Sequence, residues 1–232
     1  WMGRAINTLL PVASIGGEVV KARMLILWGH PKAEASASVV VDKTVQVFGL
    51  IIWGLIGALL LVHYSIDQDL VAAAVIGFFI LGAGTAGFVL VQKAGIVRAA
   101  VNSAHIITKS DYFGNMKDGA DQVDACVRNC YSRPWRLTQS IFWRVLTLLL
   151  QSAEVWVAAY VLGHPISIME AMFLKSLTST LSDIAFIIPN AYGIQEGAFV
   201  VLGAMIGLPA DLMLAVSLSI RIRELIIDVP GL

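Results

Sequence analysis

Two glutamates, Glu18 and Glu196, each follow a proline and one or more glycines inside an apolar stretch. The sequence reads Pro11-Val-Ala-Ser-Ile-Gly-Gly-Glu18 in one place and Pro189-Asn-Ala-Tyr-Gly-Ile-Gln-Glu196 in the other. Proline and glycine interrupt helices, so each glutamate is predicted to lie in the first turn of a new helical segment. The residues that define these helix breaks are Pro11, Gly16, Gly17, Pro189, Gly193 and Gly197.

Two interpretations of these glutamates are open at the sequence level. A carboxylate in the first turn of a helix stabilises the unpaired backbone N–H groups there. An ionisable side chain inside a membrane is costly, however, and usually serves a function. Glu18 and Glu196 would then line a central cavity and contact a polar headgroup or a coupling proton. The two roles are compatible.

Further charges lie deep in the apolar stretches. Arg221 and Glu224 are spaced to pair on one helix, and Lys43 with Glu18 or Arg221 with Glu196 are further candidate pairs. Such charges form either a cavity for a phosphate or amine headgroup or a set of neutralising ion pairs. Lys175 and Asp183 share a helix face and are expected to complete this polar interior. The candidate substrate-binding residues are Glu18, Arg23, Asp42, Lys43, Gln195, Glu196, Arg221, Arg223 and Glu224.

Composition defines the class of protein. The chain is 58% hydrophobic and 14% charged, with a mean hydropathy of +0.80, whereas soluble domains are roughly 45–50% apolar and 25% charged. We therefore expect an all-α polytopic membrane protein.

Cys126 and Cys130 lack the further ligands that a metal site needs, and we interpret them as reduced thiols. The sequence has no P-loop and no serine–histidine or zinc motif, so we expect no cofactor, no metal and no nucleic-acid partner.

An internal duplication is the strongest pattern in the chain. Residues of the same or similar type recur at one constant sequence offset. The pairs are Pro11/Pro189, Glu18/Glu196, Gly29/Gly207, Pro31/Pro209 and Lys43/Arg221. Such self-similarity indicates a repeated structural unit. We place the first repeat at about 5–63 and the second at about 166–230, within a single transmembrane domain over 1–232. We expect this domain to be cut at the N-terminus, and a cut at the C-terminus is left open.

Apolar runs predict the helices. At about 1.5 Å per residue, the segments 17–28 and 196–206 cover roughly half a bilayer, and we interpret them as half-helices or re-entrant segments. Five longer stretches are predicted spans, at 39–62, 70–91, 137–162, 166–188 and 209–229. The polar region 93–136 contains an amphipathic helix over 118–131, which we expect on the membrane surface.

The positive charges predict the orientation. The loop 93–136 is rich in lysine and arginine and should be cytoplasmic. The turns at 63–69 and 163–165 contain neither residue, which places them on the other side. Counting passes from these assignments makes the two broken segments enter from opposite sides. The sequence therefore predicts an inverted-topology repeat with two broken or re-entrant half-helices, as found in many secondary transporters.

The chain resembles the lysylphosphatidylglycerol synthase transmembrane-region family over nearly all of its 232 residues. The motifs concerned are the two glutamate motifs, Val39-Val-Val-Asp-Lys43, Gly207-Leu-Pro209 and Arg221-Ile-Arg-Glu224. That family includes the flippase domain of the multiple peptide resistance factor and the hopanoid biosynthesis-associated membrane proteins, which the chain resembles more closely. Family members usually carry one or two further N-terminal spans, and the synthetase domain of the resistance factor is absent here. We therefore do not expect this chain alone to make aminoacylated lipid.

The resemblance implies lipid translocation across the bacterial inner membrane, with Glu18 and Glu196 as the central pair and Arg221, Arg223 and Glu224 beside them. We expect a flippase for a phospholipid, an aminoacyl lipid or a hopanoid, which exposes its charged cavity alternately to the two sides. One alternative is a membrane-embedded enzyme that modifies a lipid headgroup. Another is a scaffold for lipid-synthesis enzymes, which are also candidate partners. The sequence leaves the oligomeric state open.

Overall fold

The computed structural model describes residues 1–9, 16–64, 117–184 and 191–232, together with isolated positions between 76 and 90. Every regular element in these ranges is a helix, which confirms the all-α fold class. Several sequence predictions fall outside these ranges, namely those for Pro11, Pro189 and the loop residues 93–116. The predicted span at 70–91 also lies outside them, except for the isolated positions. The helices are α1 (Met2–Leu9), α2 (Gly16–Leu27), α3 (Lys32–Tyr64), α6 (Lys117–Tyr131), α7 (Pro134–Val161), α8 (Ile168–Ile184), α9 (Ile194–Met205), α10 (Ala210–Asp228) and the short 3-10 helix η2 (Val229–Gly231).

The helices predicted from the apolar runs agree with α2, α3, α7, α8, α9 and α10 to within a few residues at most of their ends. Two of the described helices, α3 and α7, are long and apolar enough to cross a membrane by length and composition. In contrast, α2 and α9 have 12 residues each. At about 1.5 Å per residue, each is roughly half as long as the hydrocarbon core is thick.

The same local structure ends both short helices. After α2, the His30 N–H bonds to Leu25 O (3.1 Å) and the Gly29 N–H bonds to Ile26 O (3.0 Å). After α9, the Leu208 and Gly207 N–H groups bond in the same way to carbonyls five and three residues earlier. Both glycines have positive φ, +91° and +75°. These are Schellman C-caps, and the proline two residues beyond each glycine immediately precedes the following long helix.

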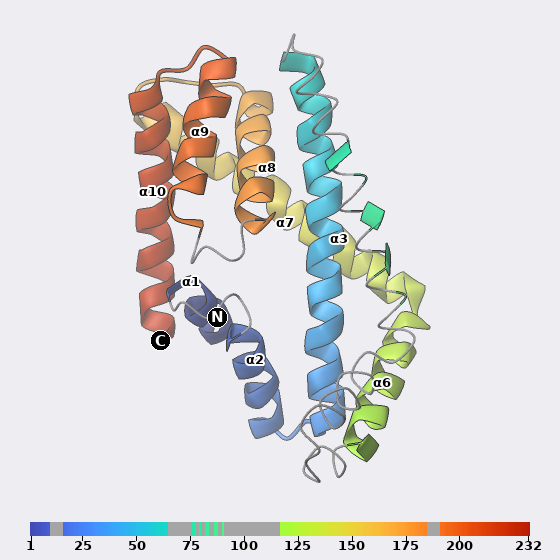
Figure 1. Cartoon of the computed structure of the whole chain (residues 1–232). Helices are drawn as coiled ribbons and strands as arrows, with labels where there is room; N and C mark the ends of the chain where they lie inside the picture. Colours follow the sequence, from blue (N-terminus) through green and yellow to red (C-terminus); the bar gives the residue numbers. More distant parts are fainter. Residues whose placement is uncertain are drawn as a thin grey trace, which may run out of the picture.

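The two short helices point in opposite directions. In Figure 1, α2 runs from the middle of the molecule down to a turn that leads into α3. In the same view, α9 runs from the middle up to a turn that leads into α10. The start of each short helix therefore lies near the middle of the molecule, and the two helical hairpins open toward opposite ends.

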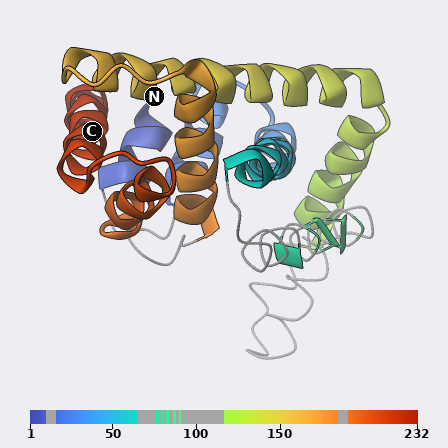
Figure 2. The same cartoon turned by 90° about the horizontal axis from the view of Figure 1, so that it is seen from above.

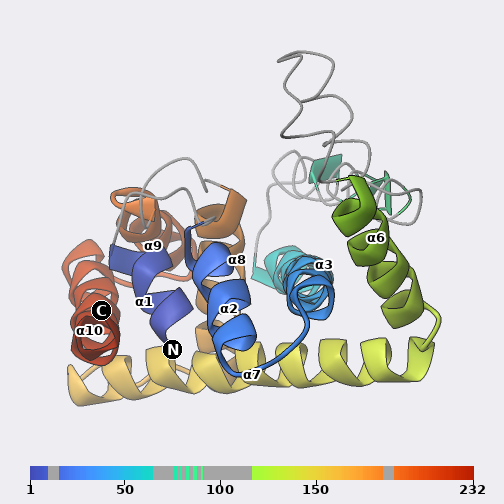
Figure 3. The same ribbon diagram turned by 90° about the horizontal axis from the view of Figure 1, so that it is seen from below.

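Helix α7 packs across this arrangement. It runs diagonally behind α3 and α8 in Figure 1 and along one side of all the long helices in Figure 2. Helices α1 and α2 lie below α8 and α9, and α1 lies beside the lower end of α10 (Figures 1 and 3). Residues of α1, α7 and α8 line one cavity together with residues from the starts of α2 and α9.

Close helix packing depends on small residues. The main apolar core comes from the end of α3 and from α7, α8, α9 and α10, and includes Phe173, Phe199 and Met213. At Gly57 of α3, an added Cβ would lie 2.6 Å from Ser176 Oγ of α8. Small residues let helices approach closely in lipid, where water provides no driving force between helices. Gly57 is therefore a contact point that sets the α3–α8 distance.

Helix α6 confirms the helix predicted over 118–131. Its apolar residues, which were expected to rest on the membrane surface, pack against α3 instead. Its apolar residues Val123 and Val127 pack against Val41 of α3, and Val127 is fully buried. Tyr131 Oη lies 3.0 Å from Thr44 Oγ1 of α3 and is hydrogen-bonded to it. The apolar side of α6 is thus covered by protein rather than resting on the membrane surface.

We expect Gly57→Ala to lower the free energy of unfolding by about 1–3 kcal/mol, because an added methyl group in a tight contact forces helices apart. Thermal unfolding of the purified protein in detergent would measure this. Gly197→Ala is the matched control, because nothing lies within 4 Å of a Cβ added there. Equal losses in the two variants would contradict the packing role of Gly57.

Candidate functional site

Glu18 lies in the first turn of α2 and is only 8% exposed. Two lysines neutralise it: Lys43 Nζ of α3 lies 3.0 Å from Oε1, and Lys21 Nζ lies 3.1 Å from both oxygens. Lys21 also reaches Asp42 (3.4 Å), which accepts a 2.8 Å hydrogen bond from Gln46. A buried charge requires such partners, and here they tie α2 to α3. We call this the Glu18 cluster.

Glu196 holds the corresponding place in the first turn of α9. One carboxylate oxygen lies 3.1 Å from Nε of Arg221 on α10, and the other accepts the Gly193 N–H at 2.8 Å. Glu196 therefore caps its helix and forms an ion pair at the same time. The Arg221 guanidinium also lies 4.9 Å from the centre of the Tyr192 ring, a cation–π contact.

The second group of charges extends to α7. Arg221 lies 3.7 Å from Glu224, and Arg223 lies 3.7 Å from the other oxygen of Glu224. Arg223 Nη2 donates a 3.0 Å hydrogen bond to Glu154 of α7. Together with Glu196, these residues form what we call the Glu196 cluster. It links the second short helix to two long helices.

The two clusters contain equivalent ion pairs. The sequence interval from Glu18 to Lys43 equals the interval from Glu196 to Arg221. Both pairs, predicted from the sequence, form in the structure. Each pair joins the start of a short helix to the long helix that follows it, and so each closes a helical hairpin.

The helix starts themselves differ. The Gly17 N–H of α2 bonds to Asn7 Oδ1 of α1 at 2.7 Å, so a neighbouring helix supplies that cap. A Cβ at Gly17 would lie 1.9 Å from Gly3 O, which explains why glycine is needed there. Gly193 precedes α9 with φ +83°, a left-handed conformation that favours glycine. Gly16 and Gly197 lie within the first turns of α2 and α9.

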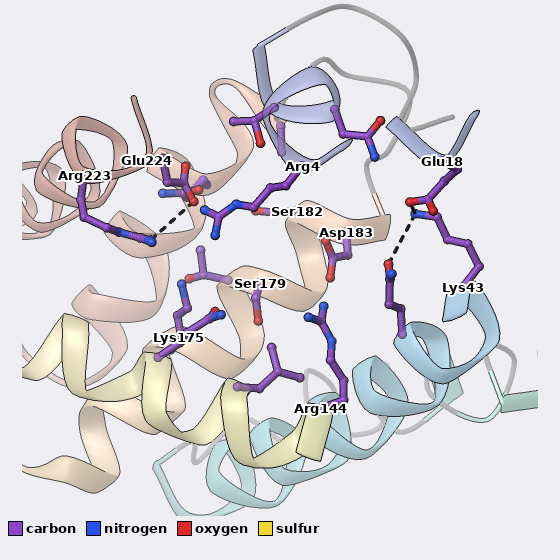
Figure 4. A pocket seen from close by; sticks show the side chains of 18 of the residues that line it. Arg4, Glu18, Lys43, Arg144, Lys175, Ser179, Ser182, Asp183, Arg223 and Glu224 are labelled. Atoms are coloured by element: carbon purple, nitrogen blue, oxygen red, sulfur yellow. Dashed lines mark hydrogen bonds and ion pairs between the residues drawn. The ribbon is translucent and has the colours of Figure 1, made fainter. Parts of the chain in front are cut away.

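A cavity of about 430 Å³ separates the two clusters. Figure 4 shows Glu18 and Lys43 at one side, Arg223 and Glu224 at the other, and residues of α7 and α8 between them. The lining comes from seven helices, α1, α2, α3, α7, α8, α9 and α10, or from segments next to them. Its charged members are Arg4, Glu18, Lys21, Lys43, Arg144, Lys175, Asp183, Arg223 and Glu224.

The structure divides the predicted substrate-binding residues into two groups. Those that line the cavity are Glu18, Lys43, Gln195, Arg223 and Glu224. Glu196 and Arg221 are not among the lining residues, and their ion pair holds α9 against α10. Asp42 lines neighbouring cavities, and Arg23 is exposed on α2. Lys175 and Asp183 line the cavity from α8, on the shared helix face noted in the sequence.

Sequence reasoning missed several cavity residues, among them the arginines Arg4 and Arg144. Arg4 comes from the short helix α1, where it pairs with Asp228 of α10 at 3.3 Å. Arg144 comes from α7, a helix outside both predicted repeats. The sequence contains one usable signal for Arg144, an arginine within a predicted span, because such residues in membranes usually face a protein interior.

The cavity offers binding groups more clearly than catalytic ones. The described residues contain no group of three or more histidine, cysteine, aspartate or glutamate side chains that could hold a metal ion. The charged side chains mostly pair with one another, while the remaining polar lining consists of amides and hydroxyls such as Gln151, Thr178 and Ser179. Such a lining suits a polar or charged group of a ligand.

Fold and site together define an all-helical, multi-pass membrane protein with a charged internal cavity. The family described as "Lysylphosphatidylglycerol synthase TM region" matches residues 1–230, and the chain belongs to this family. The family associates the chain with lipid metabolism or transport. Searches of curated proteins and of solved structures found no match.

The pair of Glu18 and Lys43 allows a double-mutant test. We expect Glu18→Gln and Lys43→Gln each to lower stability by about 1–3 kcal/mol, because each removes the ion pair between α2 and α3, and Lys43→Gln leaves the buried Glu18 with Lys21 alone. The double variant should lose less than the sum of the two. Unfolding in detergent would measure the coupling, with Glu34→Gln at an exposed site as control. Additive losses would show that the pair is not coupled.

Proposed function

We propose that this protein is a lipid flippase or transporter of the bacterial inner membrane. It moves a phospholipid, an aminoacyl lipid or a hopanoid by alternating exposure of its charged cavity. The observation that carries the proposal is the cavity itself, which lies between two oppositely directed helical hairpins. The family supports a role with lipids.

The physical problem in lipid translocation is the headgroup. A polar group without hydrogen-bond partners costs several kcal/mol in an apolar medium, and a charged group costs more. The cavity replaces water with side chains such as Lys43, Gln195, Ser179 and Arg223. A headgroup could therefore cross within the protein while its acyl chains stay in the bilayer.

A second cavity fits the apolar part of such a lipid. It measures about 550 Å³ and lies between α1, α2 and α3. Its lining is mostly apolar and includes Val20, Met24, Leu25 and Trp28, but it also contains Lys21. Because Lys21 lines both cavities, the polar and apolar spaces adjoin there. This arrangement matches an amphipathic ligand.

The alternating exposure rests on an inverted-topology repeat. The two hairpins carry equivalent ion pairs and equivalent Schellman caps, and they open toward opposite ends of the molecule. In transporters of this design, one repeat moves against the other around a site near the membrane midplane. The short helices α2 and α9 would then act as re-entrant segments that approach the site from opposite sides.

The proposed role requires no chemical step. Among the described residues, the lining of the cavity consists mainly of paired charges, amides and hydroxyls, which suit binding, so we propose a translocator rather than an enzyme. Analysis of the lipid after incubation would separate the two: a translocator returns the lipid with unchanged mass. A scaffold for lipid-synthesis enzymes would instead tolerate loss of the cavity charges.

Translocation can be measured in liposomes that contain the protein and a fluorescent phospholipid, by following the fraction that a membrane-impermeant quencher can reach. We expect Lys43→Gln and Arg223→Gln each to slow translocation roughly ten-fold, because each removes a charged donor from the cavity. Glu34→Gln, on an exposed face of α3, should translocate at the wild-type rate.

The same assay would overturn the proposal in two ways. Liposomes that contain well-folded wild-type protein and show no translocation for any of the three lipid classes would contradict the function. Unchanged rates in both cavity variants would contradict the role of the cavity.

The proposed orientation places α6 in the cytoplasm and the turn after α7 on the opposite side. Gly119 of α6 and His164 of that turn are both exposed. In a background with Cys126→Ser and Cys130→Ser, we expect His164→Cys to react with an impermeant maleimide on intact cells stripped of their outer membrane. Gly119→Cys should react only after permeabilisation. The reverse labelling pattern would show that the topology is opposite to the proposed one.

A further inference from the structure

Two cations in the polar cavity have no ion-pair partner in the described part of the chain. They are Arg144 of α7 and Lys175 of α8, which both line the space between the Glu18 and Glu196 clusters. Arg4, Lys21, Lys43 and Arg223 also line this cavity, but each of these pairs with a carboxylate. Arg144 and Lys175 therefore differ from the other basic residues of the site.

Unpartnered hydrogen-bond donors line the same cavity as these two cations. Arg144 Nε, Thr178 Oγ1 and Ser182 Oγ are all buried and make no hydrogen bond within the described residues. Lys175, Thr178 and Ser182 follow one another at intervals of three and four residues, so they lie on one face of α8. All of these side chains line the same cavity. The wall formed by α7 and α8 thus presents a set of free donors.

The stem of Arg144 is held in place by packing. A Cβ at Gly49 of α3 would lie 2.6 Å from Arg144 Cγ, so the absence of a side chain at Gly49 makes room for this arginine. A cation that is removed from water and left unpaired is costly. A costly group that is held in position and shares its cavity with free donors calls for a bound acceptor.

We propose that Arg144 and Lys175 form an anion subsite that binds the phosphate group of a phospholipid. Thr178 and Ser182 donate hydrogen bonds to the same phosphate oxygens. Cationic and neutral donors together fit this group, since a phosphodiester carries one negative charge spread over oxygens that accept several hydrogen bonds. The lipid source of the phosphate rests on the proposed translocation of lipids, whereas the subsite itself does not.

Asp183 limits where the anion can lie. This carboxylate also lines the cavity, and Figure 4 shows it near the Arg144 guanidinium on the side away from Lys175. No ion pair joins Asp183 to Arg144 in the part of the chain that the structure describes. Because like charges repel, the phosphate should bind on the Lys175 side of Arg144, and Asp183 should weaken its binding.

The test is binding by the whole purified chain in detergent, measured from the rise in unfolding temperature as ligand is added. Three probes are compared: a short-chain phosphatidylglycerol, inorganic phosphate and a diacylglycerol that lacks phosphate. We expect phosphatidylglycerol to bind and diacylglycerol not to bind. A response to inorganic phosphate as well would show that the subsite recognises the phosphate alone.

The variants are Arg144→Gln and Lys175→Gln, which keep part of each stem. We expect each to weaken phosphatidylglycerol binding roughly ten-fold, the usual effect of losing one charged hydrogen bond. Without ligand, their unfolding temperatures should not fall, because each change removes an unpaired cation. Arg144→Lys should retain much of the affinity, and Asp183→Asn should increase it. Lys32→Gln, at an exposed position, controls for the loss of one positive charge.

Three results would overturn the subsite: wild-type affinity in both glutamine variants, equal binding of diacylglycerol, or a marked loss of stability in the ligand-free variants that accounts for the weaker binding. The translocation assay keeps the two proposals apart. Phosphatidylglycerol binding that depends on Arg144 and Lys175, without translocation, would leave the subsite and reject the flippase. Translocation at the wild-type rate in both variants would reject the subsite and leave the flippase.

Discussion

The structure depends on the pairing of charges that its apolar helices bury. A carboxylate or ammonium group removed from water is stable only beside opposite charges and hydrogen-bond donors. The pairs Glu18–Lys43 and Glu196–Arg221 satisfy this condition, and each joins the start of a short helix to the long helix that follows. Because the ion pair fixes two points on each hairpin, it also fixes how α2 lies against α3 and how α9 lies against α10. The charges thus determine local geometry as well as polarity.

The half-length helices turn this pairing into a site. A helix as short as α2 or α9 is only about half as long as the hydrocarbon core of a bilayer is thick, and the first turn of each, with its acidic side chain, lies near the middle of the molecule. Two such turns, approached from opposite ends, leave a polar space between them that no full-length helix fills in the part of the chain that the structure describes. Helices α7 and α8 supply the remaining wall, and the cavity therefore forms at the junction of the two hairpins.

Much of this could be predicted from the sequence, and the reasons are local. The constant offset between the two repeats anticipated both ion pairs and both glycine–proline turns, because those features depend on spacing within one hairpin. The helices followed from apolar runs. Contacts between distant segments could not be predicted in this way. The Asn7 cap on Gly17 depends on how α1 packs, and the position of Arg144 depends on the oblique path of α7. The sequence predicted that the apolar side of α6 rests on the membrane surface, because the sequence alone does not show that α3 covers this side.

The two clusters resemble each other but do not face the cavity equally. Glu18 leaves the capping of α2 to Asn7, and its own carboxylate lines the cavity. Glu196 caps α9 itself and pairs with Arg221 but does not line the cavity, where Gln195, Arg223 and Glu224 lie instead. An exact two-fold repeat would give both glutamates the same exposure. In a protein that exposes one cavity alternately to two sides, each conformation treats its halves differently, and their roles exchange when the conformation changes. A difference such as that between Glu18 and Glu196 is what one conformation of the proposed cycle would show.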